Sequence, residues 1–303
     1  MREDYKIRQL VVISGKGGTG KTTLCAALSH LLEKKVVCDT DVDAANLHLL
    51  LSPQVKETRD FFGSERAAVD RGKCTRCRRC VDTCRFDAFV FDTDGFPYVR
   101  EEYCEGCGAC LQVCGPLAVK MIPHKSGEFY LSETNVGPMV HARLGIAEDN
   151  SGRLVSDVRK AAVKIAQERK LSHVLIDGPP GIGCPVIASI TGTSLALAVT
   201  EPTVSGAHDL MRILSLTAHF EVPTLVVINK FDINTDMSEK IEREAESAGA
   251  PVVGKIPYHE GVIDAVRRKK TLIESGPVEV KGEIIGIFEE IKKRLDGYPK
   301  QGE

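Results

Sequence analysis

The sequence lacks the features that would direct it to a membrane or to a nucleic acid. No apolar run reaches the roughly 18–20 residues that span a bilayer, and the first ten residues, MREDYKIRQL, contain no apolar core of a secretory signal. The formal net charge is −2, so no broad basic surface is available for nucleic acid. We therefore expect a cytoplasmic protein with no stable membrane insertion and no nucleic-acid partner.

Low-complexity segments and internal repeats are also absent, apart from two groups of cysteines. The 303 residues are 43% hydrophobic, which is enough for a sizeable core. Clustered cysteines in a reducing compartment usually bind metal instead of forming disulfides. Eight of the eleven cysteines lie in the two groups, and we expect Cys25 and Cys38 to be ordinary core residues.

Apolar strands alternate with amphipathic helices on both sides of the cysteine-rich stretch. Near-continuously apolar strands separated by helices indicate a parallel sheet covered on both faces, which is a doubly wound α/β fold. We expect strands at 9–14, 35–39, 173–177, 194–200, 223–230 and 251–257, and helices at 21–34, 153–170, 208–220, 238–248 and 282–295.

Residues 67–123 follow another pattern, with short strands and dense cysteine, so we expect an inserted small α+β domain. The core then consists of residues 1–66 and 124–303. The last helix, 282–295, has one apolar face, for which packing on the sheet is favoured over lying on a membrane surface.

The segment GKGGTGKT at residues 15–22 matches GxxxxGK[ST] between a strand and a helix. Its glycines let successive backbone N–H groups point at phosphate oxygens. We expect Lys21 to contact the β and γ phosphates and Thr22 to ligate Mg²⁺. The other expected phosphate contacts are Gly17, Gly18, Thr19, Gly20 and Thr23.

The two cysteine groups share the spacing CxxCxxCxxxC. In two-cluster ferredoxins the fourth cysteine of each run ligates the other cluster. The spacing therefore predicts two [4Fe–4S] clusters in a bacterial-ferredoxin-like domain, one on Cys74, Cys77, Cys80 and Cys114 and the other on Cys104, Cys107, Cys110 and Cys84. Zinc is less favoured, because structural zinc sites pair two CxxC units and leave a third cysteine of each run without use. The proline that usually follows the fourth cysteine is replaced by Arg85 and by Gly115.

Charge differs between the two runs, because arginine crowds the first and glutamate accompanies the second. Positive charge favours the more negative, reduced state of a cluster, so we expect the first cluster to have the higher potential. Electrons would pass from the acidic side to the basic side, and an acidic redox partner would dock on the arginines. Alternatively, the arginines form only a solvated basic face that binds no partner.

The form KGGxGKTT at residues 16–23 resembles the deviant P-loop of the MinD/ParA/Mrp-like ATPases of the SIMIBI class. This resemblance implies a homodimer that sandwiches nucleotide, in which Lys16 reaches the partner's phosphates like an arginine finger. The segment DTDVD resembles the family's first switch, so Asp41 would place the attacking water and Asp39 would lie beside the Mg²⁺. Asp43 is a substitute for this role, or alternatively a helix N-cap.

The segment VLIDGPPGIG resembles the Walker B strand and second switch, which implies that Asp177 holds Mg²⁺ through water and that residues 178–183 form a hinge-like loop. Asn229 corresponds to the family's adenine contact, whereas Asp232 completes an NKxD pattern typical of GTPases. The resemblance favours ATP over GTP. The loop 256–262, including Pro257, would close over the base, with His259 on the surface. Cys184 has an offset from Asp177 like that of a cluster ligand in the nitrogenase iron protein, but a bridging role is disfavoured because the second ligand has no counterpart.

Together these features predict a Mg²⁺-dependent ATPase that carries two [4Fe–4S] clusters and couples ATP binding and hydrolysis to electron transfer to a partner protein. An ATP-dependent assembly or carrier protein for clusters or metal cofactors is the alternative. Eight thiolates leave no labile position, which argues for retained clusters. ATP-dependent amidation is disfavoured because no amidotransferase domain follows residue 303, and chromosome or division-site positioning is disfavoured for want of a basic face or a membrane helix.

Overall fold

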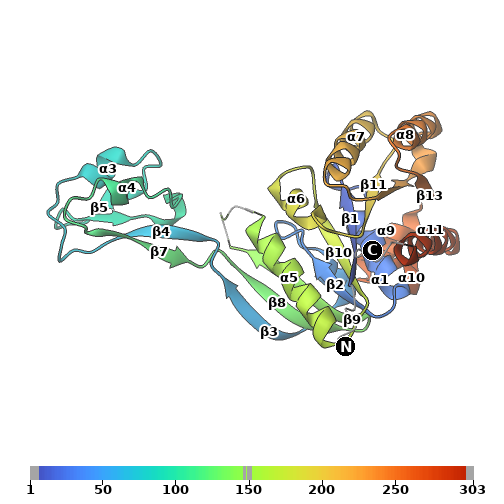
Figure 1. Cartoon of the computed structure of the whole chain (residues 1–303), viewed down its shortest axis with the longest axis horizontal. Coiled ribbons are helices and arrows are strands. Elements are labelled where there is room, and N and C mark those ends of the chain that lie inside the picture. The colour runs from blue at the N-terminus through green and yellow to red at the C-terminus, as the bar shows by residue number, and fades with distance from the viewer. Residues whose placement is uncertain (1–6, 146–147, 149–151, 298–303) are drawn as a thin grey trace, which may run out of the picture. The chain divides into compact units, whose positions relative to one another are not determined.

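The computed structural model describes residues 7–145, 148 and 152–297 and divides the chain into two compact units (Figure 1). The core unit comprises Met1–Thr58, Phe129–Arg143 and Asn150–Glu303, and the cysteine unit comprises Arg59–Glu128 and Leu144–Asp149. The cysteine-rich stretch 67–123 therefore lies within the second unit.

Among the described residues, nine strands form one sheet in the order β13-β12-β11-β1-β10-β2-β9-β8-β3. Every pairing from β13 through β9 is parallel, which confirms the mostly parallel sheet. The strands are β1 (Arg8–Ser14), β2 (Lys35–Asp39), β3 (Gln54–Phe61), β8 (Gly127–Thr134), β9 (Gly137–Leu144), β10 (His173–Pro180), β11 (Leu195–Thr200), β12 (Thr224–Asn229) and β13 (Val252–Ile256).

Helices cover both faces of this sheet, as expected for a doubly wound fold (Figure 1). One face carries α1 (Lys21–Leu31), α9 (Glu260–Arg267), α10 (Leu272–Ser275) and α11 (Val278–Asp296). The other carries α5 (Arg153–Glu168), α6 (Cys184–Ile190) and α7 (Val204–His219). Short α2 (Leu47–Leu51) follows β2, and α8 (Thr235–Ser247) follows the 3₁₀ turn η2 (Phe231–Ile233).

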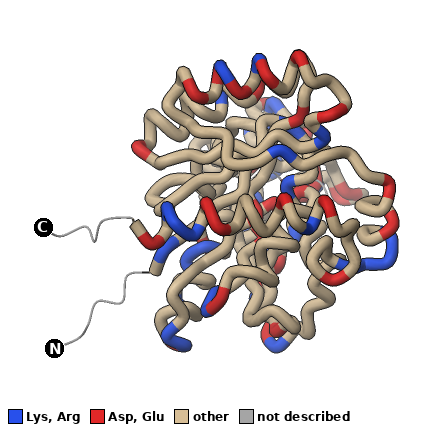
Figure 2. The backbone as a smooth tube through the Cα atoms, turned by 90° about the vertical axis from the view of Figure 1, so that its right-hand side faces the viewer, with Lys and Arg blue, Asp and Glu red and all other residues tan. Residues whose placement is uncertain are grey.

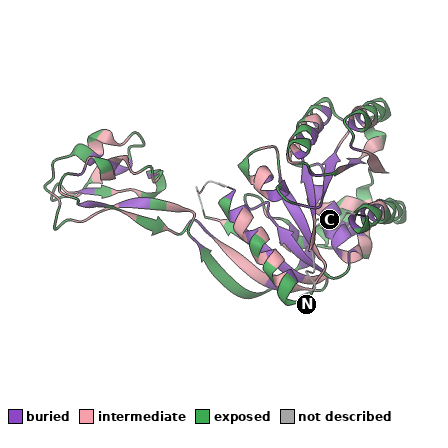
Figure 3. Ribbon diagram, viewed as in Figure 1, coloured by how far each residue is buried: buried purple, intermediate pink, exposed green. Residues whose placement is uncertain are grey.

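The core lies between the sheet and its helices; β2 and β11 are buried along their whole length, and β1 and β10 along most of theirs (Figure 3). Successive side chains of a strand face opposite sides, so Leu10 and Val12 of β1 pack toward α1 while Val11 and Ile13 face the other helix layer. The apolar face of α11 belongs to the same core as Leu10. Gly254 of β13 leaves room for Ile287, because an added Cβ would lie 2.2 Å from Ile287 Cγ1. Packing of the last helix on the sheet is therefore confirmed.

Several element limits differ from the predicted ones for local reasons. Helix α7 begins at Val204, four residues before the predicted start, because the Thr203 hydroxyl accepts a hydrogen bond from Gly206 N at 2.9 Å and caps it. Helix α1 ends at Leu31, and Lys34 adopts a left-handed turn with φ 47° before β2. Strands β3, β8 and β9 were not predicted; they extend the sheet beyond β2.

The cysteine unit contains two small antiparallel pairs, β4 (Ser64–Val69) with β7 (Val119–His124) and β5 (Phe89–Phe91) with β6 (Pro97–Val99). Short helices α3 (Arg79–Thr83) and α4 (Ala109–Gln112) follow the two cysteine loops, and the 3₁₀ turn η1 (Glu101–Tyr103) directly precedes the second loop. Its interior is small, and cysteines form much of it: Cys80, Cys104, Cys110 and Cys114 are buried with Ala67, Ala88, Phe89, Ala118 and Val119.

Charges of both signs are interspersed along the helices of the core unit (Figure 2). On α8, for example, Lys240 pairs with Glu244 and Arg243 with Glu239, each one turn apart. In the described part of the chain, no helix is both long enough and apolar enough to cross a membrane.

Candidate functional site

The loop between β1 and α1 has the backbone shape of a phosphate cradle. Gly18 and Gly20 adopt left-handed conformations, with φ 84° and 88°, which favour glycine. A Cβ on Gly20 would also lie 2.3 Å from Asn229 Nδ2. No side chain caps α1, and the Thr19 hydroxyl oxygen is buried without a hydrogen-bond partner among the described residues. The N-terminus of α1 is thus open to an anion.

Lys21, the first residue of α1, lies among carboxylates. Its Nζ is 2.8 Å from Asp177 Oδ1 and 3.5 Å from Asp41 Oδ2. Burial alone would lower the pKa of Lys21, but Asp177 and Asp41 outweigh it and raise this pKa above its ordinary value. The ammonium group therefore stays charged, and in this structure the carboxylates stand in for the phosphates that a nucleotide would bring.

The three aspartates meet because β2 and β10 are parallel neighbours, with Asp39 in register with Asp177. Burial first, and then the charge of Asp177, raise the pKa of Asp39, and burial also raises the pKa of Asp41. The oxygens of Asp39 accept hydrogen bonds from Asp41 N at 3.1 Å and Leu47 N at 3.3 Å. Asp39 thereby fixes the loop that leads to α2.

Among these aspartates, Asp177 has a carboxylate oxygen that is available to a ligand. It is fully buried, and its Oδ2 has no hydrogen-bond partner among the described residues. A buried carboxylate oxygen without a partner is costly unless a ligand satisfies it, and oxygen is the ligand that Mg²⁺ prefers. These residues fit a Mg²⁺ ion held with a phosphate. Asp43 does not cap α2, whose N-cap is Asn46.

Lys16 contacts residues that the sequence analysis did not select. Its Nζ lies 2.9 Å from Glu201 Oε1 and 3.2 Å from the hydroxyl oxygens of Thr203 and Ser205. Glu201 also pairs with Lys230 at 3.1 Å; burial opposes ionisation of Glu201, but the two lysines hold its pKa below the ordinary value. Glu201 directly follows β11, and the carboxyl end of a central parallel strand is the signal that would have found it.

A cavity of about 270 Å³ adjoins the cradle and approaches the size of a small-ligand site, roughly 300–1,000 Å³. Its lining is mostly apolar: Gly20, Thr23, Leu24, Val199, Asn229, Lys230, Ile256, Val262, Ile263, Val266, Arg267, Leu272 and Ile284. Asn229 Nδ2 donates to Thr19 O at 2.8 Å and joins the cavity to the cradle.

Two predicted base contacts do not line this cavity. Asp232 Oδ1 instead accepts from Tyr258 N at 2.7 Å, and Pro257 precedes that residue in the loop. The carboxylate that would pair with guanine is therefore engaged elsewhere. His259 is exposed and caps α9 by accepting from Gly261 N at 2.9 Å.

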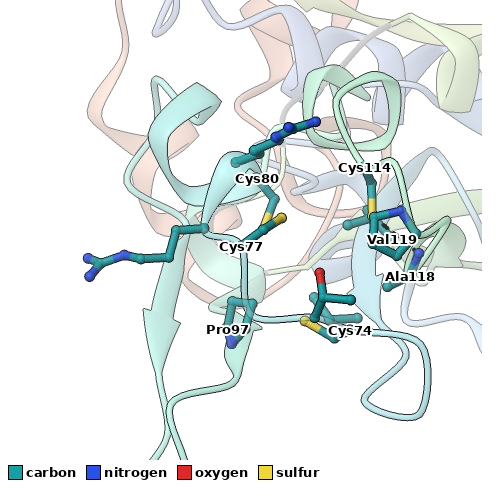
Figure 4. Close-up of a pocket in the computed structure, with 12 residues that line it drawn as sticks. Cys74, Cys77, Cys80, Pro97, Cys114, Ala118 and Val119 are labelled. Atoms are coloured by element: carbon teal, nitrogen blue, oxygen red, sulfur yellow. Dashed lines mark hydrogen bonds between the residues drawn. The ribbon is translucent and has the colours of Figure 1, made fainter.

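The eight clustered cysteines line two hollows in the cysteine unit. Figure 4 shows Cys74, Cys77 and Cys80 around one hollow with Cys114, which comes from the other run. Cys104, Cys107 and Cys110 line the second hollow together with Cys84 from the first run. The structure thus brings together both predicted sets of four.

Backbone N–H groups point at several of these sulfurs. Arg76 N lies 3.4 Å from Cys74 Sγ, Ala67 N 3.5 Å from Cys104 Sγ and Ala118 N 3.2 Å from Cys114 Sγ. A hydrogen bond from the backbone of Arg79 lowers the pKa of the Cys77 thiol. Such donors stabilise thiolate over thiol.

The side chains are not gathered closely enough for a single ion. Among the described residues, no group of three or more His, Cys, Asp or Glu side chains converges on one metal-ion position. The thiolates of an iron–sulfur cubane ligate different corners of the cluster and lie farther apart than the ligands of one ion. Four cysteines around each hollow match in number the four thiolates that a cubane cluster takes.

The two cysteine loops share two left-handed backbone positions but fill them with different residues. Gly106 and Gly108 of the second loop have φ 65° and 75°, whereas Arg76 and Arg78 hold the matching positions of the first loop at φ 58° and 66°. Left-handed backbone at a non-glycine residue costs about 1–3 kcal/mol and is concentrated at functional sites. In the sequence these arginines stand out only by their charge, whereas their left-handed backbone is a property of the folded chain.

The remaining cysteines differ in exposure. Cys25 and Cys38 are fully buried in the core unit, which confirms them as core residues, and burial raises the pKa of both thiols. Cys184 is exposed at the first residue of α6.

Comparisons with known proteins identify the core. The model of the CobQ/CobB/MinD/ParA nucleotide binding domain matches residues 10–273. An uncharacterized protein of Methanocaldococcus jannaschii is 35% identical over 232 residues, which cover 75% of this chain and 80% of that protein.

Two solved structures share the fold. The MinD protein of Pyrococcus horikoshii, in complex with Mg-ADP, has a TM-score of 0.58 at 18% identity and covers 98% of this chain and 100% of its own. The cell division ATPase MinD of Pyrococcus furiosus has a TM-score of 0.56 at 20% identity and covers 94% and 98%. With its phosphate cradle, buried lysine and open carboxylate, the chain belongs to the CobQ/CobB/MinD/ParA nucleotide-binding family and is a P-loop ATPase.

Proposed function

We propose that this ATPase holds two [4Fe–4S] clusters in its cysteine unit and couples ATP binding and hydrolysis to electron transfer to a partner protein. One observation carries the proposal: the eight cysteines divide into two sets of four, each with three residues of one run and one of the other. That exchange is the ligand pattern of two-cluster ferredoxins.

When bound, such clusters supply one-electron transfer at potentials set by nearby charge and hydrogen bonds. The chain's own contribution is the ligand sets, the N–H donors to sulfur and the exclusion of water. Cys80, Cys104, Cys110 and Cys114 are buried, whereas Cys77 and Cys107 are exposed. One ligand of each cluster would therefore lie at the surface, where an electron can leave.

Binding of nucleotide would change the ion-pair partners of Lys16 and Lys21. Phosphates entering the cradle would replace Asp41 and Asp177 as partners of Lys21, and Mg²⁺ would use the open Asp177 oxygen and the Thr22 hydroxyl. Lys16 would leave Glu201 and reach the phosphates of a second copy in a homodimer, as the family resemblance implies.

Chain connectivity supports coupling between the two chemistries. The cysteine unit is inserted between Asp41, in the first switch segment, and Asp177, in the second. Strands β3 and β8 each contain the position at which the chain passes from one unit to the other. The chain segments that join the two units therefore belong to strands of the core sheet.

An assembly or carrier role is the second candidate, and the exposed Cys77 and Cys107 are the observation that favours it, because accessible thiolates permit cluster exchange. Transfer of iron and sulfide from the reconstituted protein to an apo-ferredoxin distinguishes this role. Retention of both clusters through repeated redox cycles distinguishes electron transfer.

Anaerobic reconstitution followed by EPR with and without Mg-ATP tests the proposal. We expect iron and sulfide for two cubane clusters, signals of two interacting clusters, and a nucleotide-dependent change in potential or partner binding. Lys21→Ala should keep the clusters and abolish the nucleotide effect, because it removes the buried phosphate contact. A wild-type chain that binds zinc alone, or whose clusters do not respond to nucleotide, would contradict the proposal.

A further inference from the structure

The first cysteine loop places arginine where its counterpart has glycine. Arg76 and Arg78 occupy the left-handed positions that Gly106 and Gly108 take in the second loop. The second loop thus has the same cysteine spacing but uses glycine, which is not strained in a left-handed conformation. Cluster ligation does not require these two side chains, so their presence needs another explanation.

Both guanidinium groups are held in place at the surface. Arg76 lies over the ring of Phe96 at 4.9 Å and donates to Asp94 O at 3.1 Å, and Arg78 lies over Phe91 at 4.7 Å. Stacking of this kind orients a cation without neutralising it. Arg71 also stacks on Phe96, but it pairs with Asp92.

The remaining charge at this loop is uncompensated. Residues 70–85 contain six Lys or Arg and two Asp. Five of these cations form no ion pair with a residue that the structure describes: Lys73, Arg76, Arg78, Arg79 and Arg85. Cys77, the exposed cysteine of the first set, lies between Arg76 and Arg78 in the sequence.

We propose that this basic face, defined by Arg76, Cys77, Arg78 and Arg79, is the docking site of an acidic electron-carrier protein that takes an electron from the first cluster. The inference rests on the proposed clusters. In the step, the reduced cluster loses one electron and the carrier gains it, with no bond made or broken and no proton moved.

The second loop would reject the same partner. Residues 100–116 contain three Glu and one Arg, and Cys107 is exposed beside Glu105 and two glycines. Like charges across a docking surface repel a wrong partner and slow its encounter. A nucleic-acid partner fits less well, because the basic face is confined to one loop that surrounds a redox ligand in a chain of net charge −2.

The test compares wild type with the double variant Arg76→Gly and Arg78→Gly. Glycine relieves the left-handed strain and keeps the backbone N–H that points at Cys74, so the variant should fold and bind clusters. The matched control, Lys160→Gln with Lys164→Gln, removes the same charge from exposed positions of α5 in the core unit.

Oxidation of the dithionite-reduced, reconstituted chain is followed by stopped flow with anionic hexacyanoferrate(III) and with cationic hexaamminecobalt(III). With the anion, we expect the variant to react about three- to tenfold more slowly at low ionic strength, and the difference to vanish at high salt. With the cation, the variant should react faster than wild type. Removing positive charge lowers the cluster's potential, which by itself would speed oxidation. A slower reaction of the variant with the anion therefore reports weaker electrostatic attraction during the encounter.

Binding of fluorescein-labelled polyglutamate to the unreconstituted chain gives a readout without clusters, and we expect about tenfold weaker binding by the variant. The docking site alone would be overturned if a variant with intact clusters matched the wild type in its oxidation rates, their salt dependence and its polyglutamate binding. Arginine-dependent binding of a 20-base-pair duplex DNA in preference to polyglutamate would also overturn it. Failure of the wild type to assemble clusters would remove the proposed function and the docking site together.

Discussion

At the scale of single residues, the nucleotide site is a balance between one buried cation and several carboxylates. Lys21 is paired with Asp177 and Asp41, and Lys16 with Glu201. Breaking a buried pair is costly when one charge is left behind, so Lys21 exchanges its carboxylate partners only when a phosphate replaces them.

Asp177→Asn should weaken Mg²⁺-dependent nucleotide binding. The amide keeps the side-chain shape but removes the charge and one of the two carboxylate oxygens. Oδ2 has no hydrogen-bond partner among the residues that the structure describes. We expect the apparent Mg²⁺ affinity measured with ADP to fall by about 10- to 100-fold, as for other outer-sphere ligand changes. Titration calorimetry at several Mg²⁺ concentrations measures the change.

Asp232→Asn is the matched control, because Asp232 accepts a backbone hydrogen bond from Tyr258 and does not line the base cavity. Its Mg²⁺ affinity should stay at the wild-type value. Equal losses in both variants would show that Asp177 acts through general stability and not through the metal.

At the scale of elements, α2, β9 and β8 meet through a stack of aromatic rings. His141 of β9 lies parallel to His48 of α2, with centroids 6.0 Å apart, and stacks on Tyr130 of β8 at 5.0 Å. Burial, and secondarily His48, lower the pKa of His141 to about 4 from an ordinary 6.5. The His141 imidazole is thus neutral in the folded protein at physiological pH.

His141→Phe should flatten the pH dependence of stability between pH 6.5 and 4. Below pH 6.5 the unfolded chain takes up a proton at His141 that the folded chain does not, so acid lowers the free energy of unfolding of the wild type. We expect this histidine to contribute about 3 kcal/mol of that loss. Urea unfolding by circular dichroism at several pH values measures it, with the exposed His219→Phe as control. Parallel pH curves for wild type and His141→Phe would rule out a buried neutral imidazole.

At the scale of the whole molecule, the chain carries two opposite charge environments within one small unit. The first cysteine loop is basic and the second acidic, while the core unit mixes both signs (Figure 2). If both clusters form, this asymmetry gives electrons a direction, since positive charge stabilises the reduced cluster.

Redox titration followed by EPR should therefore resolve two midpoint potentials, with the higher one at the cluster on Cys74, Cys77, Cys80 and Cys114. Arg79→Gln should move the higher potential downward and leave the lower one nearly unchanged, because Arg79 lines the hollow of the first set and not that of the second. Two equal potentials, or a shift of the lower one alone, would contradict the assignment.

Local sequence determined much of this protein. The order strand, glycine-rich turn, helix specifies the phosphate cradle, because glycine alone combines the left-handed backbone at Gly18 and Gly20 with close packing against Asn229. Cysteine spacing likewise predicted the two sets of four around the hollows, since three cysteines of each set lie within one short loop. Tertiary structure decided what depends on neighbours distant in the chain: that Glu201 holds Lys16, that Asp177 keeps an open oxygen, and that β3, β8 and β9 extend the sheet. Strand pairing, burial and backbone strain arise from packing between distant segments, and for this reason the strained arginines beside Cys77 became evident only in the folded chain.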